Sequence, residues 1–475
     1  MLLLVALALR CDTFGDPNLH GDEAFYATVG LAMHQGALPY VDIWDRKPFG
    51  LFALFWLFGG ITAQPIGYQI GAMLCAAGTA WAIARMAARL LPGSVPAPLL
   101  AGSVYLLWLA PLQGYGGQSP VFYNLFIALA ACLALRAAPN LRTGQSPRTA
   151  QGAMLLAGIG ITIKTTALFE ALFIGLFALW QLRAAALPVA RMARIAATWA
   201  LIGALPTLAI ALAYGLLGHW AEYWQAMITA NLNKPPHWPS SQMRAGIMLL
   251  ALAPVLLAAG IGWTMLPRPA RAFVTGWLIA ALLGLMANPN FYIHYAMPIL
   301  VPLCLAAAGL LKRPLAGLAT TAAITLLSIS IAPPFRFAHT LASRAAMDRL
   351  VQAVQDHGGD GPLLVYDGPS QLYRLADKPL ITPLVFPTHL SHAIERDVSH
   401  LSTLGETRRA LEQRPDAVVM AITPRNQPVN AETQALVRGY IATHCRKVAD
   451  IAVPERQRTD RIGVWGHCRA TYPAP

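Results

Sequence analysis

The sequence predicts a polytopic α-helical membrane protein with a small α/β domain at its C-terminal end. Of its 475 residues, 56% are hydrophobic and only 12% are charged, whereas about 25% of the residues of a soluble domain are charged. The shortage is uneven, because residues 1–333 hold 18 Lys or Arg and 8 Asp or Glu, while the shorter segment 334–475 holds 17 and 14. The chain is therefore expected to consist of a membrane-embedded part, 1–333, and a soluble part, 334–475.

Apolar runs recur through the membrane-embedded part, and most of them approach the ~20 residues that a helix needs to cross a bilayer. The opening segment MLLLVALAL is too short to cross alone, so the first helix is incomplete or the chain starts upstream. A cleaved signal peptide is disfavoured because no basic residues precede the apolar run. Ten apolar runs follow the opening segment: 66–84, 96–112, 121–138, 151–163, 165–181, 195–217, 246–264, 272–288, 295–311 and 314–332. Together with the opening segment, they predict about 11 transmembrane helices.

The connections between these runs alternate in charge. One set carries twelve basic residues and no acid, which places it in the cytoplasm by the positive-inside rule: Arg85, Arg89, Arg136, Arg142, Arg148, Arg183, Arg191, Arg194, Arg268, Arg271, Lys312 and Arg313. The opposite set includes a first outer loop, 10–49, which contains six of the eight acids of the membrane part. Most of the net charge of +13 thus belongs to the membrane part, where basic residues set the orientation of the helices in the bilayer. We therefore do not expect nucleic-acid binding.

Two apolar segments do not fit this alternation as simple crossings. A crossing at 49–63 would invert every later loop, so this segment is predicted to be an interfacial helix that returns to the outer face. Residues 151–181 have cytoplasmic charges at both ends and are predicted to form a hairpin of two short helices with Lys164 at its outer tip.

The C-terminal segment alternates helix-like and strand-like patterns and predicts a small α/β domain on the outer face. HTLASRAAMDRLVQAVQDHG has helical periodicity, PLLVYDG and DAVVMAIT are typical of short buried strands, and RIGVWG is predicted to be an edge strand. No nucleotide-binding motif is present. Cys445 and Cys468 share this domain, where an oxidising compartment would permit a disulfide, but the sequence leaves open whether they are bonded.

The first outer loop carries the chemistry that the rest of the membrane part lacks. It reads HGDEAFYATVGLAMHQGALPYVDIWDRKPFG, in which paired acids are followed by Asp-Arg-Lys next to an interfacial helix. A loop can also be polar simply because it is hydrated, and composition alone does not separate the two interpretations.

The residues of this loop resemble those of a known group of enzymes. His20-Gly21-Asp22-Glu23-Ala24-Phe25-Tyr26, followed by Asp45-Arg46-Lys47-Pro48-Phe49, resembles the first loop of GT-C glycosyltransferases of the dolichyl-phosphate-mannose protein mannosyltransferase-like group. That group includes aminoarabinose transferases that act on lipid A. Weaker similarities follow in the same order along the chain: Ile163-Lys164-Thr165-Thr166-Ala167, Asn290 to Pro298, and Tyr366-Asp367-Gly368. Two positions depart from the group, since Phe49 replaces a second proline and GYGGQSPVFYN lacks an acid.

The resemblance implies transfer of a sugar from a polyprenyl-phosphate donor to a lipid or glycan acceptor at the outer face of a bacterial inner membrane. Such a donor already carries a good leaving group, so the site needs a base for the acceptor hydroxyl and cations for the departing phosphate. Because GYGGQSPVFYN, the second outer loop, lacks the acid that members of the group often have there, a metal requirement stays open. A divalent cation is possible, but the sequence does not support one and no metal ligands are assigned.

Asp22 is the candidate catalytic base, and Glu23 is expected to orient Asp22 or the acceptor. Each has an alternative, because Asp22 could cap the following helix and Glu23 could interact with its dipole. Lys47, assisted by Arg46, is the candidate donor-phosphate ligand, with interaction with anionic membrane lipids as the alternative. Lys164 is expected to provide a second phosphate contact, or alternatively a salt bridge to an acid of the first loop.

Five other polar residues are expected to line the outer cavity: His20, Tyr26, Asp45, His294 and Tyr295. For His294 and Tyr295, a structural hydrogen bond is an equally good explanation. Glu170 also falls in an apolar run and receives no role. His389, His392 and His400 could suggest a metal site, but a pair at i and i+3 is a weak signal and a solvated surface is the expectation.

Two other classes of function compete with the glycosyltransferase. A transporter or flippase for a glycan or lipid would place ionisable groups near the middle of the membrane and show repeated halves, but we find no internal repeat and the acids gather in one outer loop. A non-catalytic membrane scaffold with a partner-binding outer domain is the third possibility.

Overall fold

The computed structural model describes residues 1–233, 238–423 and 428–468. The chain folds as two compact units. The helical unit comprises Met1–Asp12, Ile70–Ala213 and Pro236–Phe335, and the loop unit comprises Thr13–Gln69, Tyr214–Pro235 and Arg336–Pro475. The first outer loop and the C-terminal segment therefore belong to one folded unit, although more than 250 residues separate them in the sequence.

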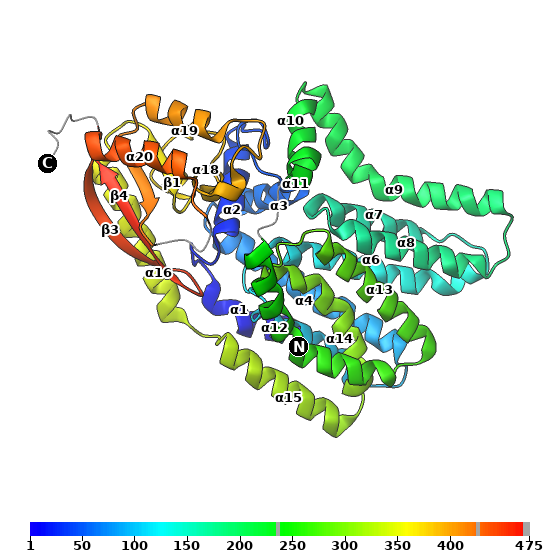
Figure 1. Cartoon of the computed structure of the whole chain (residues 1–475). Coiled ribbons are helices and arrows are strands. Elements are labelled where there is room, and N and C mark those ends of the chain that lie inside the picture. Colours follow the sequence, from blue (N-terminus) through cyan, green and yellow to red (C-terminus); the bar gives the residue numbers. More distant parts are fainter. Residues whose placement is uncertain (234–237, 424–427, 469–475) are drawn as a thin grey trace. The chain divides into compact units, whose positions relative to one another are not determined.

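The helical unit contains long apolar helices (Figure 1). Among the described residues, seven helical spans are long and apolar enough to cross a membrane: α4 (Ile66–Leu90), α6 (Ser119–Arg142), α9 (Val189–Leu216), α12 (Trp238–Thr264), α13 (Arg268–Met286), Ile293–Leu311 and α15 (Pro314–Ile331). Shorter helices accompany them: α1 (Leu2–Arg10), α5 (Pro96–Leu109), α7 (Arg148–Ile163) and α8 (Ala167–Arg183). The chain is thus a multi-pass membrane protein. The exact number of crossings stays a prediction.

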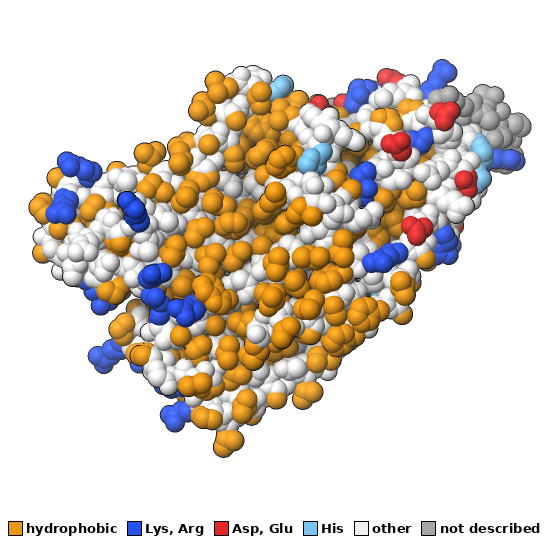
Figure 2. All heavy atoms as spheres, turned by 180° about the vertical axis from the view of Figure 1, so that it is seen from behind, with side chains coloured by type: hydrophobic (Ala, Val, Ile, Leu, Met, Phe, Trp, Pro, Cys, Tyr) orange, Lys and Arg blue, Asp and Glu red, His pale blue; other side chains and the backbone are white. Residues whose placement is uncertain are grey.

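The centre of the helical unit is the span Ile293–Leu311, which consists of the short η3 (Ile293–Ala296) and α14 (Met297–Leu311). Its apolar window is 89% buried, whereas only 6% of that of α9 is buried. Gly262 of α12 and Gly309 of α14 let these two backbones approach so closely that a Cβ on either would meet the other helix, which is the usual means of tight helix contact in membranes. Figure 2 shows apolar side chains over the exposed surface of the helices and basic side chains gathered at one end.

The predicted hairpin is confirmed. Helices α7 and α8 pack against each other, and Lys164 ends α7 in an extended conformation at the turn between them. The predicted interfacial segment is also a single helix, α3 (Phe49–Ile61). Its 13 residues span about 20 Å at 1.5 Å per residue, which is too short to cross a bilayer ~30 Å thick.

In the loop unit, α2 (Gly21–His34) packs against α3. Near Tyr214 the chain adds α10 (Trp220–Trp224), the π-helical η2 (Gln225–Thr229) and α11 (Ala230–Asn233). The C-terminal part begins with α16 (Phe337–His357), which confirms the helix predicted there. Smaller helices follow: α17 (Leu372–Leu375), α18 (Pro387–Ser391), η4 (Ala393–Glu395), α19 (Thr403–Glu412) and α20 (Ala431–His444).

A four-stranded sheet forms the core of the C-terminal part, in the order β1-β2-β4-β3. The strands are β1 (Leu363–Asp367), β2 (Ala417–Ala421), β3 (Arg446–Pro454) and β4 (Thr459–Gly466). Strands β1 and β2 are parallel, and β4 is antiparallel to both of its neighbours. The prediction of RIGVWG as an edge strand is wrong, because β4 lies inside the sheet and β3, which the sequence reading missed, covers it.

Two features tie the loop unit together. Cys445 and Cys468 form a disulfide, which answers the question that the sequence left open. Asp16 of the first loop is completely buried and accepts hydrogen bonds from the Ser343 hydroxyl of α16, at 2.5 Å, and from the backbone N–H of Asn18, at 3.0 Å. Because a buried carboxylate is costly without such partners, this network fixes the start of the first loop against α16.

Candidate active site

The start of α2 sets the position of Asp22. His20 is the N-cap residue in an extended conformation, and its Nδ1 accepts a hydrogen bond from the backbone N–H of Asp22 at 3.2 Å. The alternative that Asp22 caps this helix is therefore wrong. The Asp22 carboxylate also lies close to the His20 ring, with 3.5 Å between Oδ2 and His20 Nδ1.

Lys47 comes from the other end of the loop, immediately before α3, and meets Asp22. Its Nζ lies 3.5 Å from Oδ1 of Asp22 and 3.4 Å from both carboxylate oxygens of Asp45. The backbone N–H of Lys47 also donates to Asp45 Oδ1 at 2.9 Å. Two residues of the DRK motif and one of the paired acids, more than 20 positions apart, thus form one group. We call Asp22, Asp45, Lys47 and His389 the Lys47 cluster.

Aromatic rings surround the Lys47 ammonium. Its Nζ lies 4.9 Å from the ring centroid of Phe386, 5.2 Å from that of Tyr26 and 5.9 Å from that of Phe25. A cation gains stability over such ring faces when water is excluded. Burial opposes the charge of Lys47, but Asp45 and Asp22 outweigh burial and raise its pKa above the usual value. Lys47 is therefore a cation over the whole working pH range.

His389 of α18 completes the cluster, and the sequence reading missed it. Only 2% of its side chain is exposed, and its Nε2 lies 3.5 Å from Asp45 Oδ2. Burial lowers the pKa of His389 to about 4, although Asp45 and Glu395 act in the opposite direction. The ring is thus neutral at pH 7. The expected solvated surface is wrong for His389 and His392, which are both buried, and only His400 is exposed.

The lowered pKa of His389 predicts a loss of stability in acid. In the unfolded chain His389 binds a proton near pH 6.5, whereas in the folded protein it does so only near pH 4. Its contribution is therefore present above pH 6.5 and is lost as the pH falls toward 4, by about 3 kcal/mol in total. We expect the unfolding free energy of wild type to fall more steeply over this range than that of His389→Gln, as measured by denaturant titration in detergent. Parallel pH profiles would contradict the assignment.

Arg46 points to a different partner from the one expected. Its guanidinium donates two hydrogen bonds to the Glu395 carboxylate, at 2.6 and 2.8 Å, and both side chains are mostly buried. This bidentate geometry is the strongest form of an ion pair between these groups. Tyr40, fully buried, donates from its hydroxyl to the backbone carbonyl of Lys47 at 2.9 Å. Both contacts hold the segment that carries Lys47 in place.

Glu23 follows Asp22 on α2 but lies about 100° around the helix from it, since a helix turns by that angle per residue. Its side chain is completely buried. Adjacent positions on a helix do not face each other. Asp22 and Glu23 therefore do not form a carboxylate dyad.

The remaining predicted site residues belong to the helical unit. Lys164, Glu170, Tyr123 and Tyr295 line a small cavity. The Lys164 Nζ lies 5.0 Å from the ring centroid of Tyr295, whose ring in turn lies 4.7 Å from that of His294. Glu170, which received no role from the sequence, accepts a hydrogen bond from the indole N–H of Trp277 at 2.7 Å.

Metal ligation has no candidate in the described part of the chain. Within residues 1–233, 238–423 and 428–468, no group of three or more His, Cys, Asp or Glu side chains could hold a metal ion. His389 and Asp45 form only a pair, which is fewer than the three protein ligands that a catalytic metal usually has.

Comparison with known proteins identifies the fold. No protein-family model matches the sequence, and no curated protein is similar to it. The structure is similar to two crystal structures of ArnT from Cupriavidus metallidurans, one bound to undecaprenyl phosphate and one in the apo state. Both are 14% identical to this chain and match 98% of it, covering 97% and 95% of ArnT with TM-scores of 0.57 and 0.54. The chain therefore has the GT-C fold of ArnT, which confirms the fold expected from the resemblance.

Proposed function

We propose that the protein is an integral-membrane inverting glycosyltransferase that moves a sugar from a polyprenyl-phosphate donor to a cell-envelope lipid or glycan. The observation that carries this proposal is the meeting of a carboxylate, Asp22, and an ammonium, Lys47, at 3.5 Å in the first loop. The proposed location is a bacterial inner membrane, with the first loop and the C-terminal domain on the outer face. The likeness to an ArnT structure that binds undecaprenyl phosphate supports the choice of donor.

The proposed reaction needs one base and one cation. The acceptor hydroxyl oxygen attacks the anomeric carbon of the sugar, and Asp22 takes the hydroxyl proton. The bond between the anomeric carbon and the phosphate oxygen breaks, and its electron pair leaves with the polyprenyl phosphate. Lys47 stabilises the negative charge that develops on that phosphate. Attack opposite to the leaving group inverts the anomeric configuration.

The charges of the Lys47 cluster indicate that a second cation is needed. Asp22 and Asp45 carry two negative charges against the one positive charge of Lys47, while Arg46 and Glu395 neutralise each other. A phosphate would therefore meet a net negative group if Lys47 acted alone. Lys164, a lysine at the tip of an apolar hairpin, is the proposed second phosphate contact, because such a residue is costly unless it serves a polar partner.

Reconstitution tests the proposed function. Purified protein in liposomes is given a polyprenyl-phosphate donor with a radiolabelled sugar and lipids extracted from bacterial envelopes. We expect a labelled lipid or glycan product together with released polyprenyl phosphate. Movement of label across the membrane without a new glycosidic bond would instead indicate a transporter. Mass spectrometry of envelope glycans from cells with and without the gene would then identify the sugar and the acceptor.

A further inference from the structure

A cavity in the loop unit lies on the other side of α2 from the Lys47 cluster. Its volume is about 360 Å³, within the roughly 300–1,000 Å³ of small-molecule sites. On α2 it is lined by Ala24, Ala27, Thr28 and Leu31, which share one helical face at spacings of three and four. Asp22 lies about 180° around the helix from the centre of that face, at 100° per residue. Helix α2 therefore separates this cavity from the proposed catalytic carboxylate.

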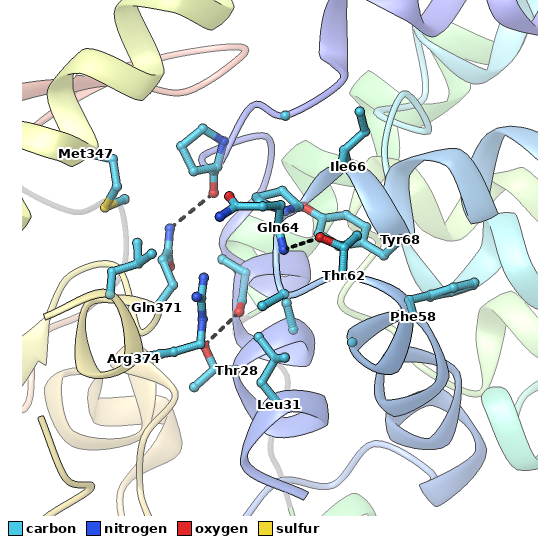
Figure 3. Close-up of a pocket in the computed structure, with 18 of the residues that line it drawn as sticks. Thr28, Leu31, Phe58, Thr62, Gln64, Ile66, Tyr68, Met347, Gln371 and Arg374 are labelled. Carbon is cyan, nitrogen blue, oxygen red and sulfur yellow. Dashed lines mark hydrogen bonds between the residues drawn. The ribbon is translucent and has the colours of Figure 1, made fainter. Parts of the chain in front are cut away.

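Most of the cavity wall is apolar. It is lined by Phe55 and Phe58 of α3, Leu31 of α2 and Met347 of α16, and Figure 3 shows Phe58 and Met347 on opposite sides. Phe55 and Met347 are each only 2% exposed. These side chains offer no hydrogen bonds to a ligand and favour a hydrocarbon group.

Arg374 of α17 brings a positive charge to this apolar space (Figure 3). Within the residues that the structure describes, its guanidinium has no hydrogen-bond acceptor or carboxylate partner. Burial without such a partner lowers the pKa of Arg374. The neighbouring Gln371 is by contrast occupied, since its amide donates to the backbone carbonyl of Pro17 at 3.1 Å. Arg374 thus presents donors to the cavity at a cost in solvation that an anion would relieve.

Two further charged residues line the cavity, and their charges are of opposite sign. Arg344 of α16 donates to the backbone carbonyls of Gly15 and Phe14, at 2.8 and 2.6 Å. Asp348, one helical turn further along α16, is exposed. With Arg374, the lining residues carry one net positive charge, so the cavity as a whole favours an anion.

The surroundings of the cavity favour a lipid as the source of that anion. Trp56, Leu57 and Ile61 of α3 are exposed by 43%, 54% and 75%, so the helix that forms one cavity wall also presents apolar side chains outward. A short helix with such a face is typical of one that lies in the membrane interface. Ile66, which lines the cavity next to α3, is 36% exposed.

We propose that this cavity is a binding site for an anionic amphiphile. Its charged headgroup pairs with Arg374, and its hydrocarbon lies against Leu31, Phe55 and Phe58. A phosphate headgroup fits this chemistry, because a guanidinium binds phosphate oxygens through two parallel hydrogen bonds. The amphiphile is either an anionic phospholipid of the membrane or the lipid acceptor of the proposed transfer, and only the second source depends on the proposed function.

Binding of a defined amphiphile tests the site without any catalysis. Hexadecyl phosphate is titrated into the full-length protein in a neutral detergent, and bound molecules are counted by native mass spectrometry. We expect Arg374→Gln to raise its Kd at least tenfold, because a charge-assisted hydrogen bond is lost. Arg408→Gln, which removes an exposed arginine outside the cavity, should leave the Kd unchanged. Arg374→Lys should recover part of the affinity.

Three ligand controls make the result decisive. Hexadecanol and inorganic phosphate, each carrying only half of the amphiphile, should bind more weakly than hexadecyl phosphate to wild type. Hexadecyl phosphocholine keeps an anionic phosphodiester beside its choline cation, so Arg374→Gln should weaken its binding less than that of hexadecyl phosphate. Equal binding of hexadecyl phosphate to Arg374→Gln and Arg408→Gln, with both variants folded by their melting temperatures, would overturn the proposal.

The transfer assay then separates the two sources. If the site holds the acceptor, Arg374→Gln raises the acceptor KM about tenfold and leaves the donor KM unchanged. If it holds a membrane phospholipid, both KM values stay the same although binding of hexadecyl phosphate is lost. Absence of transfer by wild type would contradict the proposed function alone, since the binding measurement does not require it.

Discussion

Asp22→Asn is expected to lower kcat for sugar transfer about 10³-fold, within the range that a general base contributes. Asparagine has nearly the same size and can keep the contacts of this position at the start of α2, but its amide cannot take a proton from the acceptor hydroxyl. The donor KM should change little, because Lys47 and its second carboxylate, Asp45, stay in place at 3.4 Å. The measurement is initial rate against donor and acceptor concentration with reconstituted protein.

Asp42→Asn is the matched control for this substitution. Asp42 belongs to the same loop, is exposed, and its carboxylate accepts a hydrogen bond from the nearby backbone N–H of Leu38 at 2.7 Å. It should transfer sugar at a rate close to that of wild type. If Asp22→Asn retained more than a tenth of the wild-type kcat, Asp22 would not be the base. Glu23→Gln would then be measured in the same assay.

The helices of the membrane part could be predicted well because a bilayer imposes a simple rule on composition. Charge alternation predicted that 49–63 forms a helix that returns to the same face; the structure has a 13-residue helix there, α3, and its return to that face stays a prediction. The same rule predicted the α7–α8 hairpin with Lys164 at its tip. The hairpin needs only local information, namely apolar length and flanking charge, whereas the prediction for 49–63 also uses the charges of all later loops.

The contacts that build the Lys47 cluster could be predicted only in part. The paired acids and the DRK motif identified Asp22, Asp45 and Lys47, but nothing local connects them with His389, which lies more than 340 residues further along the chain. His389 and His392 were expected in solvent because a histidine pair at i and i+3, with no cysteine or acid motif nearby, is a weak signal for a site. His389 is buried by packing against the first loop, where its ring lies 4.8 Å from that of Trp44, whereas His392 forms a β-bridge with Val429 of the C-terminal part.

The sheet illustrates the same limit. Strands β1 and β2 are buried along almost their whole length, so their continuous apolar runs were recognisable. Strand β3, with the sequence RKVADIAVP, is mostly exposed or half-buried, and its charged residues hide the pattern. Because β3 was missed, β4 was taken for an edge strand although it pairs on both sides.

Lys47→Met is expected to lower kcat/KM for the donor by about 10²–10³-fold, the typical effect of removing one group that stabilises charge in a transition state. Both a higher donor KM and a lower kcat should contribute, since the ammonium binds the phosphate before it leaves and stabilises it as it leaves. The charge-conserving variant Lys47→Arg should keep only part of the activity, because the wider guanidinium must fit between Phe25, Tyr26 and Phe386.

The substitution Lys47→Met also removes the partner of a buried carboxylate, and this effect has to be separated from catalysis. Asp45 is only 1% exposed, and Lys47 is its ion-pair partner. Loss of one member of such a pair destabilises a fold by about 3–5 kcal/mol. The double variant Asp45→Asn with Lys47→Met removes both charges and should recover most of the stability, measured as the melting temperature in detergent. If Lys47 binds the donor phosphate, the double variant stays inactive; if Lys47 only neutralises Asp45, sugar transfer returns together with stability.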